Sequence, residues 1–248
     1  MKEMYVVGRN PVLETLKSDK EIEKIYVVKG ELKGSINKII GMAKDRNIIV
    51  QYVDKKKLDQ ISQGSSHQGV AALVAPYVYY SVDDILQKAE ELDTPPFILI
   101  LDGIEDPHNL GSIIRTAECS GVHGIIIPKR RSAHVTETVY KSSAGAVEHM
   151  LIAKVNNISD TIDMLKEKGL WIYGADMGGK DYYFDVDLKG AVAIVIGSEG
   201  KGISRLVKEK CDFILSIPMA GKISSLNASN AASILMYEVV RQRHEKKS

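Results

Sequence analysis

The stretch "IPMAGKISSLNASNAAS" (residues 217–233) decides how the rest of the sequence is interpreted. It begins like the end of a buried strand, passes through a small polar loop and ends in an alanine-rich segment that indicates a helix. Asn and Ser cap helix N-termini, but a cap needs only one residue, either Ser225 or Asn227. The surplus of polar groups predicts a binding pocket at this strand-to-helix junction. The stretch offers five such residues: Ser224, Ser225, Asn227, Ser229 and Asn230.

The composition is that of an ordinary globular protein. Of the 248 residues, 44% are hydrophobic and 26% are charged. No apolar run approaches the roughly 20 residues of a membrane helix, and the first residues do not form a signal peptide. We therefore expect a soluble, cytoplasmic protein with no membrane partner.

The cysteines and the charges exclude several kinds of site. Cys119 and Cys211 lie far apart with no CxxC or His-rich spacing, which argues against a disulfide framework and against a metal site. The net charge of +1 gives no general sign of a nucleic-acid partner. Three basic clusters remain, each of which is also explained by a solvated surface or tail: 54–57, 129–131 and 241–247.

The N-terminal third alternates strand-like and helix-like segments, which predicts a compact α/β unit with helices on a sheet. His67 lies in its loop "QGSSHQG" (63–69), where it either contacts RNA or closes a turn. The predicted strands are 4–8, 24–28, 47–53 and 69–75, and the predicted helices start at Asn10, cover 35–46 and lie near Lys57.

The C-terminal part predicts a second, larger α/β domain. Residues 77–95 are expected to form an interdomain linker with one amphipathic stretch. The strands that follow are almost continuously apolar, which is typical of a parallel sheet covered on both faces. Ligands bind beyond the carboxyl ends of such strands, so the loops there are the candidate sites. The predicted strands are 97–102, 124–128, 150–155, 170–176, 191–197 and 213–218.

The loop after the first of these strands leads into a helix that we expect to begin at Asn109, with Asn109 as its cap. Arg115 lies roughly 150° away from the apolar stripe of this helix, so it is not a core residue. Either a surface arginine or a site residue fits this pattern. The stripe consists of Leu110, Ile113, Ile114 and Ala117.

A second loop, "VIGSEGKGIS" (195–204), follows a buried strand and contains Gly197, Gly200 and Gly202. Glycines there allow the backbone to approach a ligand closely. The spacing matches neither the P-loop nor the Rossmann fingerprint. Glu199 suits a cationic or hydroxyl-bearing ligand better than a phosphate, although a glutamate at a loop tip is often simply solvated.

Three segments, "NLGSIIRTAE", "IVIGSEGKGIS" and "IPMAGKISSLNASNAASI", resemble in order and spacing the motifs of the SpoU family, also called the TrmH family, of RNA 2′-O-ribose methyltransferases. The resemblance covers roughly 97–243. The segments 8–18 and 65–72 are similar to the RNA-binding domain of the RlmB-like subgroup, which modifies large-subunit ribosomal RNA.

The resemblance implies a fold and an assembly. We expect a knotted methyltransferase domain over 96–248, an α/β trefoil knot of the SPOUT type with a mostly parallel sheet. A small N-terminal α/β RNA-binding domain is expected over 1–76, and the linker over 77–95. Family members form homodimers through the knotted domain, and the second subunit completes the active site.

The resemblance also implies a cofactor and a set of site residues. The cofactor is S-adenosyl-L-methionine, and the residues expected to bind it are Gly197, Ile217, Met219, Ser225 and Leu226. The residues expected at the reacting centre are Asn109, Arg115, Glu199, Ser225 and Asn227.

Arg115 matches the arginine that acts in the family on the ribose 2′-hydroxyl together with the target phosphate. Because arginine almost never gives up a proton, we favour a phosphate clamp over a general base. Lys141, in "KSSAGA" (141–146), is a further candidate for RNA contact.

The predicted substrate is a guanosine of 23S ribosomal RNA, although the motifs do not encode which nucleotide is methylated. The alternatives are a tRNA ribose methyltransferase of the same fold and an RNA-binding protein that has lost catalysis. A nucleotide-phosphate-binding protein that uses "GSEGKG" is disfavoured by its loop spacing.

Overall fold

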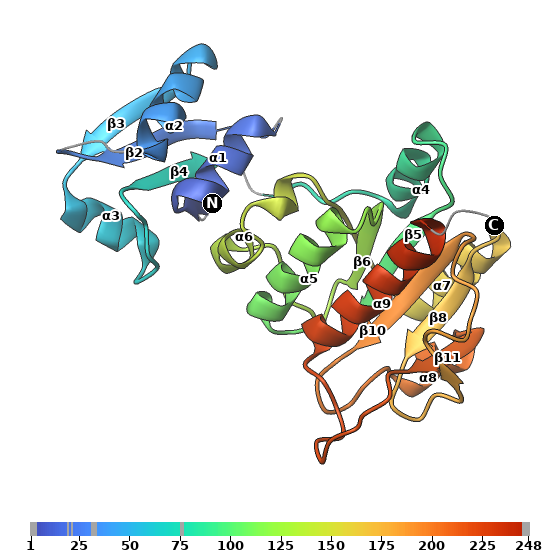
Figure 1. Cartoon of the computed structure of the whole chain (residues 1–248). Coiled ribbons are helices and arrows are strands. Elements are labelled where there is room, and N and C mark those ends of the chain that lie inside the picture. Colours follow the sequence, from blue (N-terminus) through green and yellow to red (C-terminus); the bar gives the residue numbers. More distant parts are fainter. Residues whose placement is uncertain (1–3, 19, 21, 31–33, 75–76, 245–248) are drawn as a thin grey trace. The chain divides into compact units, whose positions relative to one another are not determined.

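The computed structural model describes residues 4–18, 20, 22–30, 34–74 and 77–244. The chain forms two compact units (Figure 1). The N-terminal unit consists of Met1–Val78 together with His134–His149. The C-terminal unit consists of Tyr79–Ala133 and Met150–Ser248.

The N-terminal unit is built on a mixed four-stranded sheet in the order β1-β4-β2-β3. Strands β2 and β3 are parallel, and β4 is antiparallel to both β1 and β2. The strands and helices predicted for this region are confirmed. They are β1 (Met4–Val7), α1 (Arg9–Lys17), β2 (Ile22–Val28), α2 (Ser35–Asp45), β3 (Ile49–Val53), α3 (Lys55–Ser62) and β4 (Val70–Val74).

The two N-terminal segments that carry the resemblance meet in this unit. Arg9 donates from its Nε to the carbonyl of Gln68 at 2.9 Å, and its backbone N–H donates to the Gln68 side chain at 3.1 Å. His67 closes the turn before β4, because its Nδ1 accepts from the N–H of Gly69 at 2.9 Å and its Nε2 lies 3.0 Å from Asp59. Of the two interpretations of His67, the structure supports the turn.

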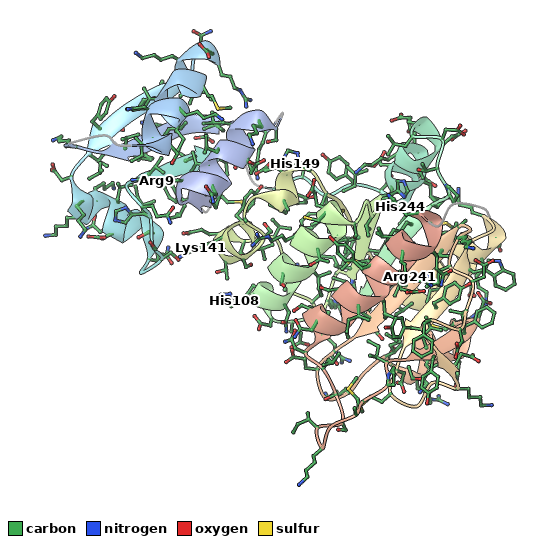
Figure 2. All side chains as sticks on the ribbon, viewed as in Figure 1. Arg9, His108, Lys141, His149, Arg241 and His244 are labelled. Carbon is green, nitrogen blue, oxygen red and sulfur yellow. The ribbon has the colours of Figure 1, made fainter. Side chains whose placement is uncertain are left out.

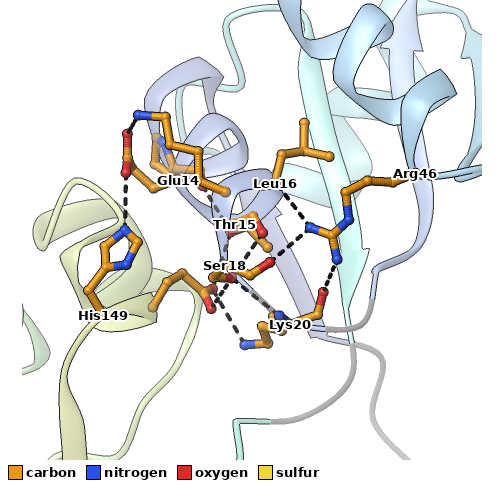
Figure 3. Close-up of polar contacts among 10 residues, drawn as sticks. Glu14, Thr15, Leu16, Ser18, Lys20, Arg46 and His149 are labelled. Carbon is orange, nitrogen blue, oxygen red and sulfur yellow. Dashed lines mark hydrogen bonds and ion pairs between the residues drawn. The ribbon is translucent and has the colours of Figure 1, made fainter.

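The segment 134–149 contains α6 (Glu137–Ser142) and the 3₁₀ helix η1 (Ala146–Glu148). Within the N-terminal unit it packs against the α1 region through polar contacts that Figure 3 shows. Glu148 accepts from the hydroxyls of Thr15 at 3.2 Å and Ser18 at 3.1 Å, and the Lys20 ammonium lies 3.7 Å away. Lys20 also lies over the Tyr140 ring. Burial lowers the pKa of Lys20 to about 8, although Glu148 opposes this shift.

The C-terminal unit contains a seven-stranded sheet in the order β7-β6-β5-β10-β8-β11-β9, and every strand pair in it is parallel. The predicted strands are confirmed, and the short edge strand β9 was not predicted. The strands are β5 (Phe97–Asp102), β6 (Gly124–Pro128), β7 (Leu151–Val155), β8 (Trp171–Ala175), β9 (Asp181–Tyr182), β10 (Val192–Gly197) and β11 (Phe213–Ser216).

Helices cover both faces of this sheet. On one face α5 (Pro107–Cys119) and α9 (Ala228–His244) lie side by side (Figure 1). On the other face α4 (Val82–Glu91), α7 (Ile158–Glu167) and α8 (Arg205–Lys210) pack through Ile85, Ile162 and Val207. Because strand residues alternate between faces, Ile98 and Ile100 of β5 belong to this second core. Helix α4 lies within the expected linker, yet its Ile85 is fully buried against the sheet.

The last turns of α9 fix this helix to the start of the sheet. Figure 2 shows Arg241 and His244 in this part of α9. Arg243 donates to the carbonyls of Pro95, Pro96 and Gly190 and lies over the Phe97 ring. The described part of the basic cluster 241–247 therefore has a structural role. Among the described residues, no helix has the length and apolarity needed to span a membrane.

Candidate active site

Three of the predicted site residues form one hydrogen-bonded network. Asn109 donates from Nδ2 to Glu199 Oε1 at 2.9 Å, and Asn227 donates from Nδ2 to the same oxygen at 2.5 Å. Asn227 Nδ2 also lies 3.0 Å from Asn109 Oδ1. Asn109 lies 90 residues before Glu199 and Asn227 lies 28 residues after it, so three distant parts of the chain meet at this carboxylate.

The sheet explains why these residues meet. Strands β5 and β10 are neighbours in register, with Asp102 opposite Gly197, so the loops that follow them emerge side by side. The first loop leads to Asn109 in α5 and the second contains Glu199. The predicted cap of α5 is wrong: the helix begins at Pro107, and Asp106 caps it by accepting from the N–H of His108 at 2.8 Å. Pro at the first helical position explains the earlier start.

The predicted stripe of α5 is confirmed, because Leu110, Ile113, Ile114 and Ala117 are buried. Asn109 lies within the first turn of α5 and is 8% exposed. Because Asp106 caps the helix, the Asn109 side chain is available to hydrogen-bond with Glu199.

Asn227 joins the network from the start of α9. Its Oδ1 accepts from the Ser229 N–H at 2.9 Å and from the Ser229 hydroxyl at 2.6 Å. This is the capping interaction that the opening stretch predicts, and Asn227 performs it. The Asn227 amide is therefore held at both ends, its oxygen by the helix and its nitrogen by Glu199.

The loop after β10 depends on glycine at the last position of the strand, Gly197. Ser198 and Gly202 exchange two backbone hydrogen bonds, of 3.1 and 2.9 Å, so the loop folds back on itself. A Cβ on Gly197 would overlap the backbone of Gly202 and Ile203. Gly200 and Gly202 have φ of 82° and 65°, in the region that favours glycine. The loop therefore presents Glu199 from a tight backbone turn.

This turn forms one wall of a cavity of about 490 Å³, here named the Leu226 cavity. The size is that of a small-molecule site. The walls are mainly apolar side chains and backbone, and the polar groups come from both loops. All five residues predicted to bind a cofactor line it: Gly197, Ile217, Met219, Ser225 and Leu226.

Asp176 lines the same cavity and was not predicted. It accepts from the Gly178 N–H at 2.9 Å and pairs with Lys208 at 2.9 Å. Burial alone raises the pKa of Asp176, but the hydrogen bonds from Lys208 and Gly178 outweigh it and lower the pKa below its usual value. A carboxylate directly after a parallel strand, here β8, is the signal in the sequence that indicates this position.

A second cavity of about 620 Å³, here named the Arg131 cavity, opens at the ends of β5, β6, β7 and β10. Asn109 and Glu199 line it as well, and Ser198, Glu199, Lys201 and Gly202 are shared with the Leu226 cavity. The network thus lies where the two cavities adjoin.

Arg115 lies apart from both cavities. It is exposed on α5 and lines neither of them, as its angle to the apolar stripe predicts. Lys141 belongs to the N-terminal unit, where Figure 2 shows it. Among the residues that the structure describes, no group of three or more His, Cys, Asp or Glu side chains is arranged to hold a metal ion.

Comparison with known proteins places the chain in a family. Residues 96–237 match the SpoU rRNA methylase family, and residues 5–80 match the substrate-binding domain of RNA 2′-O-ribose methyltransferases. A Bacillus subtilis protein, YacO, named for the TrmH family of tRNA/rRNA methyltransferases, is 52% identical over 240 residues, 97% of this chain and 96% of that protein. A Staphylococcus aureus relative with the same family name is 50% identical over 245 residues, 99% of this chain and 98% of its own.

Solved structures agree in fold. The SpoU methyltransferase AviRb of Streptomyces viridochromogenes, solved with the cofactor AdoMet, has a TM-score of 0.81 and 26% identity, covering 99% of this chain and 92% of its own. An AdoMet-bound rRNA methyltransferase of Sinorhizobium meliloti has a TM-score of 0.80 at 24% identity, covering 96% and 87%. The knot itself stays an expectation from the resemblance. The chain belongs to the SpoU family, also called the TrmH family, of RNA 2′-O-ribose methyltransferases.

Proposed function

We propose that this S-adenosylmethionine-dependent RNA methyltransferase acts on the ribose 2′-hydroxyl of a guanosine in 23S ribosomal RNA, in the cytoplasm. The observation that carries this proposal is the position of the Glu199 network between two cavities. One cavity suits the methyl donor, and the other is lined by Arg130 and Arg131, whose guanidinium groups suit RNA.

The Leu226 cavity fits the cofactor. Gly197 lets the turn close tightly, because a Cβ there would collide with the backbone of Gly202 and Ile203, and the closed turn forms one wall of the cavity. Ile217, Met219 and Leu226 offer apolar surface to an adenosine, while Ser225 and Asp176 offer polar groups to a zwitterionic tail. When bound, S-adenosylmethionine supplies a methyl group on a positively charged sulfur.

The network orients the accepting hydroxyl. A carboxylate has about four acceptor sites, so Glu199 accepts from both amides and still accepts from a ribose hydroxyl. That hydrogen bond draws the proton away from the 2′-oxygen as the oxygen becomes nucleophilic. Asn109 and Asn227 keep the carboxylate in place, which lowers the reorganisation needed during the reaction.

Arg115 binds the phosphate of the target nucleotide in this proposal. It lies six residues after Asn109, about 9 Å further along α5. Because Arg115 lines neither cavity of its own chain, the proposal includes a homodimer in which a second copy completes the RNA-binding surface. A guanidinium binds phosphate bidentately and stays protonated, which suits a clamp better than a base.

The N-terminal substrate-binding domain supports ribosomal RNA as the substrate. It occupies 5–80, where tRNA enzymes of this fold are expected to carry terminal basic extensions instead. The family name of the relatives covers both tRNA and rRNA, so transfer RNA is the second candidate. The catalytically silent alternative is disfavoured by the intact Asn109, Glu199 and Asn227 network.

Purified protein, tritiated S-adenosylmethionine and unmodified RNA fractions test the proposal. We expect label in ribose of 23S RNA and not in tRNA. Arg115→Ala should lower incorporation at least tenfold while cofactor binding, measured by calorimetry, stays unchanged. Arg205→Ala, an exposed arginine of α8, serves as the control. Near-normal turnover by Arg115→Ala would refute the clamp, and label confined to tRNA would refute the substrate.

A further inference from the structure

The Arg131 cavity has a set of polar groups that the transfer of a methyl group does not use. Arg130 and Arg131 line it from the loop after β6, and Glu105 lines it from the loop after β5. Within the described part of the chain none of these three side chains has a hydrogen bond or ion pair, so their polar groups are available to a ligand.

The other carboxylates of the cavity are already engaged. Asp102 accepts from the Ser204 N–H at 2.7 Å, and Asp106 caps α5. Glu199 accepts from Asn109 and Asn227. Among the described residues, Glu105 is the carboxylate of this cavity that has no hydrogen bond or ion pair within the protein, so both of its oxygens can accept from donors of a ligand. The cavity therefore offers guanidinium donors on one side and a carboxylate acceptor on the other.

Backbone hydrogen bonds on both sides of Arg130 and Arg131 hold the turn that carries them in a fixed conformation. The Lys129 N–H donates to the Val155 carbonyl at 2.9 Å, and the Ala133 N–H donates to the Ile104 carbonyl at 2.7 Å. Arg131 itself has φ 56°, a left-handed conformation that is unusual for a residue other than glycine. Such conformations persist where the surroundings fix them, and they gather at ligand sites.

We propose that the Arg131 cavity binds the guanine base of the methylated nucleotide and so determines base specificity. Guanine presents acceptors at O6 and N7, which suit a guanidinium, and donors at N1 and N2, which suit a carboxylate. Arg130 or Arg131 binds the first edge and Glu105 the second. Adenine reverses this pattern at position 6, where it presents a donor to the arginines.

The position of the cavity agrees with this assignment. It shares Glu199 with the Leu226 cavity, so a base held here places its ribose at the network and its 2′-hydroxyl toward the cofactor. The volume of about 620 Å³ is large enough for one nucleotide. The base must leave the RNA stack to enter, as bases do in enzymes that act on single nucleotides. This inference rests on the proposed function, because it takes the ribose to be the group that reacts.

Nucleotide binding tests the inference separately from methyl transfer. The full chain is first saturated with S-adenosylhomocysteine, whose binding by calorimetry tests the cofactor proposal alone. Saturation-transfer NMR then measures binding of guanosine, inosine, adenosine and uridine 5′-monophosphates. We expect guanosine monophosphate to bind tightest, and inosine monophosphate, which lacks the N2 amine, to bind several-fold more weakly.

Substitutions of Glu105 and Arg131 test whether these two residues cause the preference for guanine. Glu105→Gln should remove most of the preference for guanosine over inosine monophosphate. It should weaken guanosine monophosphate more than inosine monophosphate, because the hypoxanthine base keeps the N1 donor but lacks the N2 amine. Arg131→Gly removes the guanidinium and suits the positive φ, so it should weaken guanosine monophosphate roughly tenfold without disturbing the turn. Arg205→Ala should change nothing.

The outcomes are decisive in both directions. Loss of guanine preference in Glu105→Gln and Arg131→Gly, with Arg205→Ala unchanged, supports the base site. Equal binding of all four nucleotides by the wild-type chain would overturn it, as would a guanine preference that both variants retain. Failure of S-adenosylhomocysteine to bind would instead contradict the proposed function.

Discussion

The two ends of the Asn227 side-chain amide have different functions. Its oxygen caps α9 through Ser229, and its nitrogen donates to Glu199 and Asn109. Three of the five polar residues of the opening stretch therefore have a defined role: Asn227 is the cap, Ser225 lines the Leu226 cavity, and Ser229 supports the cap.

Asn227→Ser tests the separation. Serine caps a helix about as well as asparagine, so the free energy of unfolding should change by less than about 0.5 kcal/mol. The amide donor to Glu199 is lost, so we expect kcat to fall at least roughly a hundredfold. Urea unfolding and a methylation assay measure the two effects. Asn227→Ala is the comparison, because it should lose about 1 kcal/mol as well as activity. Full activity in Asn227→Ser would contradict the network.

Glu137 predicts a pH dependence of stability. Burial raises its pKa from 4.5 to about 7, although Lys141 opposes the shift, and Oε1 is buried without a hydrogen bond. The folded state therefore holds the proton more tightly than the unfolded state. Stability is fully present below about pH 4.5 and falls as the pH rises toward about 7.

Glu137→Gln removes the ionisation. We expect it to leave stability unchanged at pH 4.5 and to raise it by roughly 2 kcal/mol at pH 8. Urea unfolding at the two pH values checks this, with the exposed Glu167→Gln as the control. Equal effects of Glu137→Gln at both pH values would show that Glu137 ionises normally.

At the scale of elements, the β10 loop links the fold to the site. The double hydrogen bond between Ser198 and Gly202 closes the turn over Gly197, and this turn carries Glu199. A methyl group at position 197 cannot be accommodated without moving backbone.

Gly197→Ala should therefore lower the free energy of unfolding by about 3 kcal/mol and abolish cofactor binding. Gly190→Ala is the control, because nothing lies within 4 Å of its added Cβ. Thermal unfolding and calorimetric titration with S-adenosylmethionine measure both effects. If the two alanine variants bound the cofactor equally well, the loop would not be the rigid wall that the cavity requires.

The elements also show how far sequence reasoning reaches. The apolar strands β5, β6 and β10 were predictable because a covered parallel sheet leaves continuous apolar runs. The loops after β5, β10 and β11 were recognisable because they contain polar residues and glycines that do not pack in a hydrophobic core. The contact of Asn109 with Glu199 was not derivable from periodicity, because it depends on β5 and β10 being neighbours. Likewise, Asp106 replaced Asn109 as the cap because Pro107 moved the helix start.

At the scale of the whole molecule, the chain leaves its N-terminal unit, forms α4, β5, α5 and β6, and then returns to it. Residues 134–149 follow β6 in sequence but pack with Met1–Val78. Tyr140 and Val147 are fully buried there. Deleting residues 1–76 would uncover these side chains, so point variants test the role of the N-terminal substrate-binding domain better than a truncation.

The buried pair of Lys20 and Glu148 should hold this segment in place, with side chains 10% and 4% exposed. Glu148→Ala leaves the Lys20 ammonium buried without its partner, so we expect a loss of about 3 kcal/mol. The double variant Lys20→Met, Glu148→Met should recover most of it. Asp54→Ala, which breaks the exposed pair with Lys29, should cost less than about 0.5 kcal/mol. Similar losses in Glu148→Ala and Asp54→Ala would argue against a buried anchor.

The account as a whole is tested most directly by mapping ribose methylation in ribosomal RNA and tRNA from cells with and without this protein. It predicts that one guanosine of 23S RNA loses its 2′-O-methyl group, and that wild-type protein restores it while Asn227→Ser does not. An unchanged 23S RNA, with or without a lost methyl group in tRNA, would contradict the substrate, and restoration by Asn227→Ser would contradict the site.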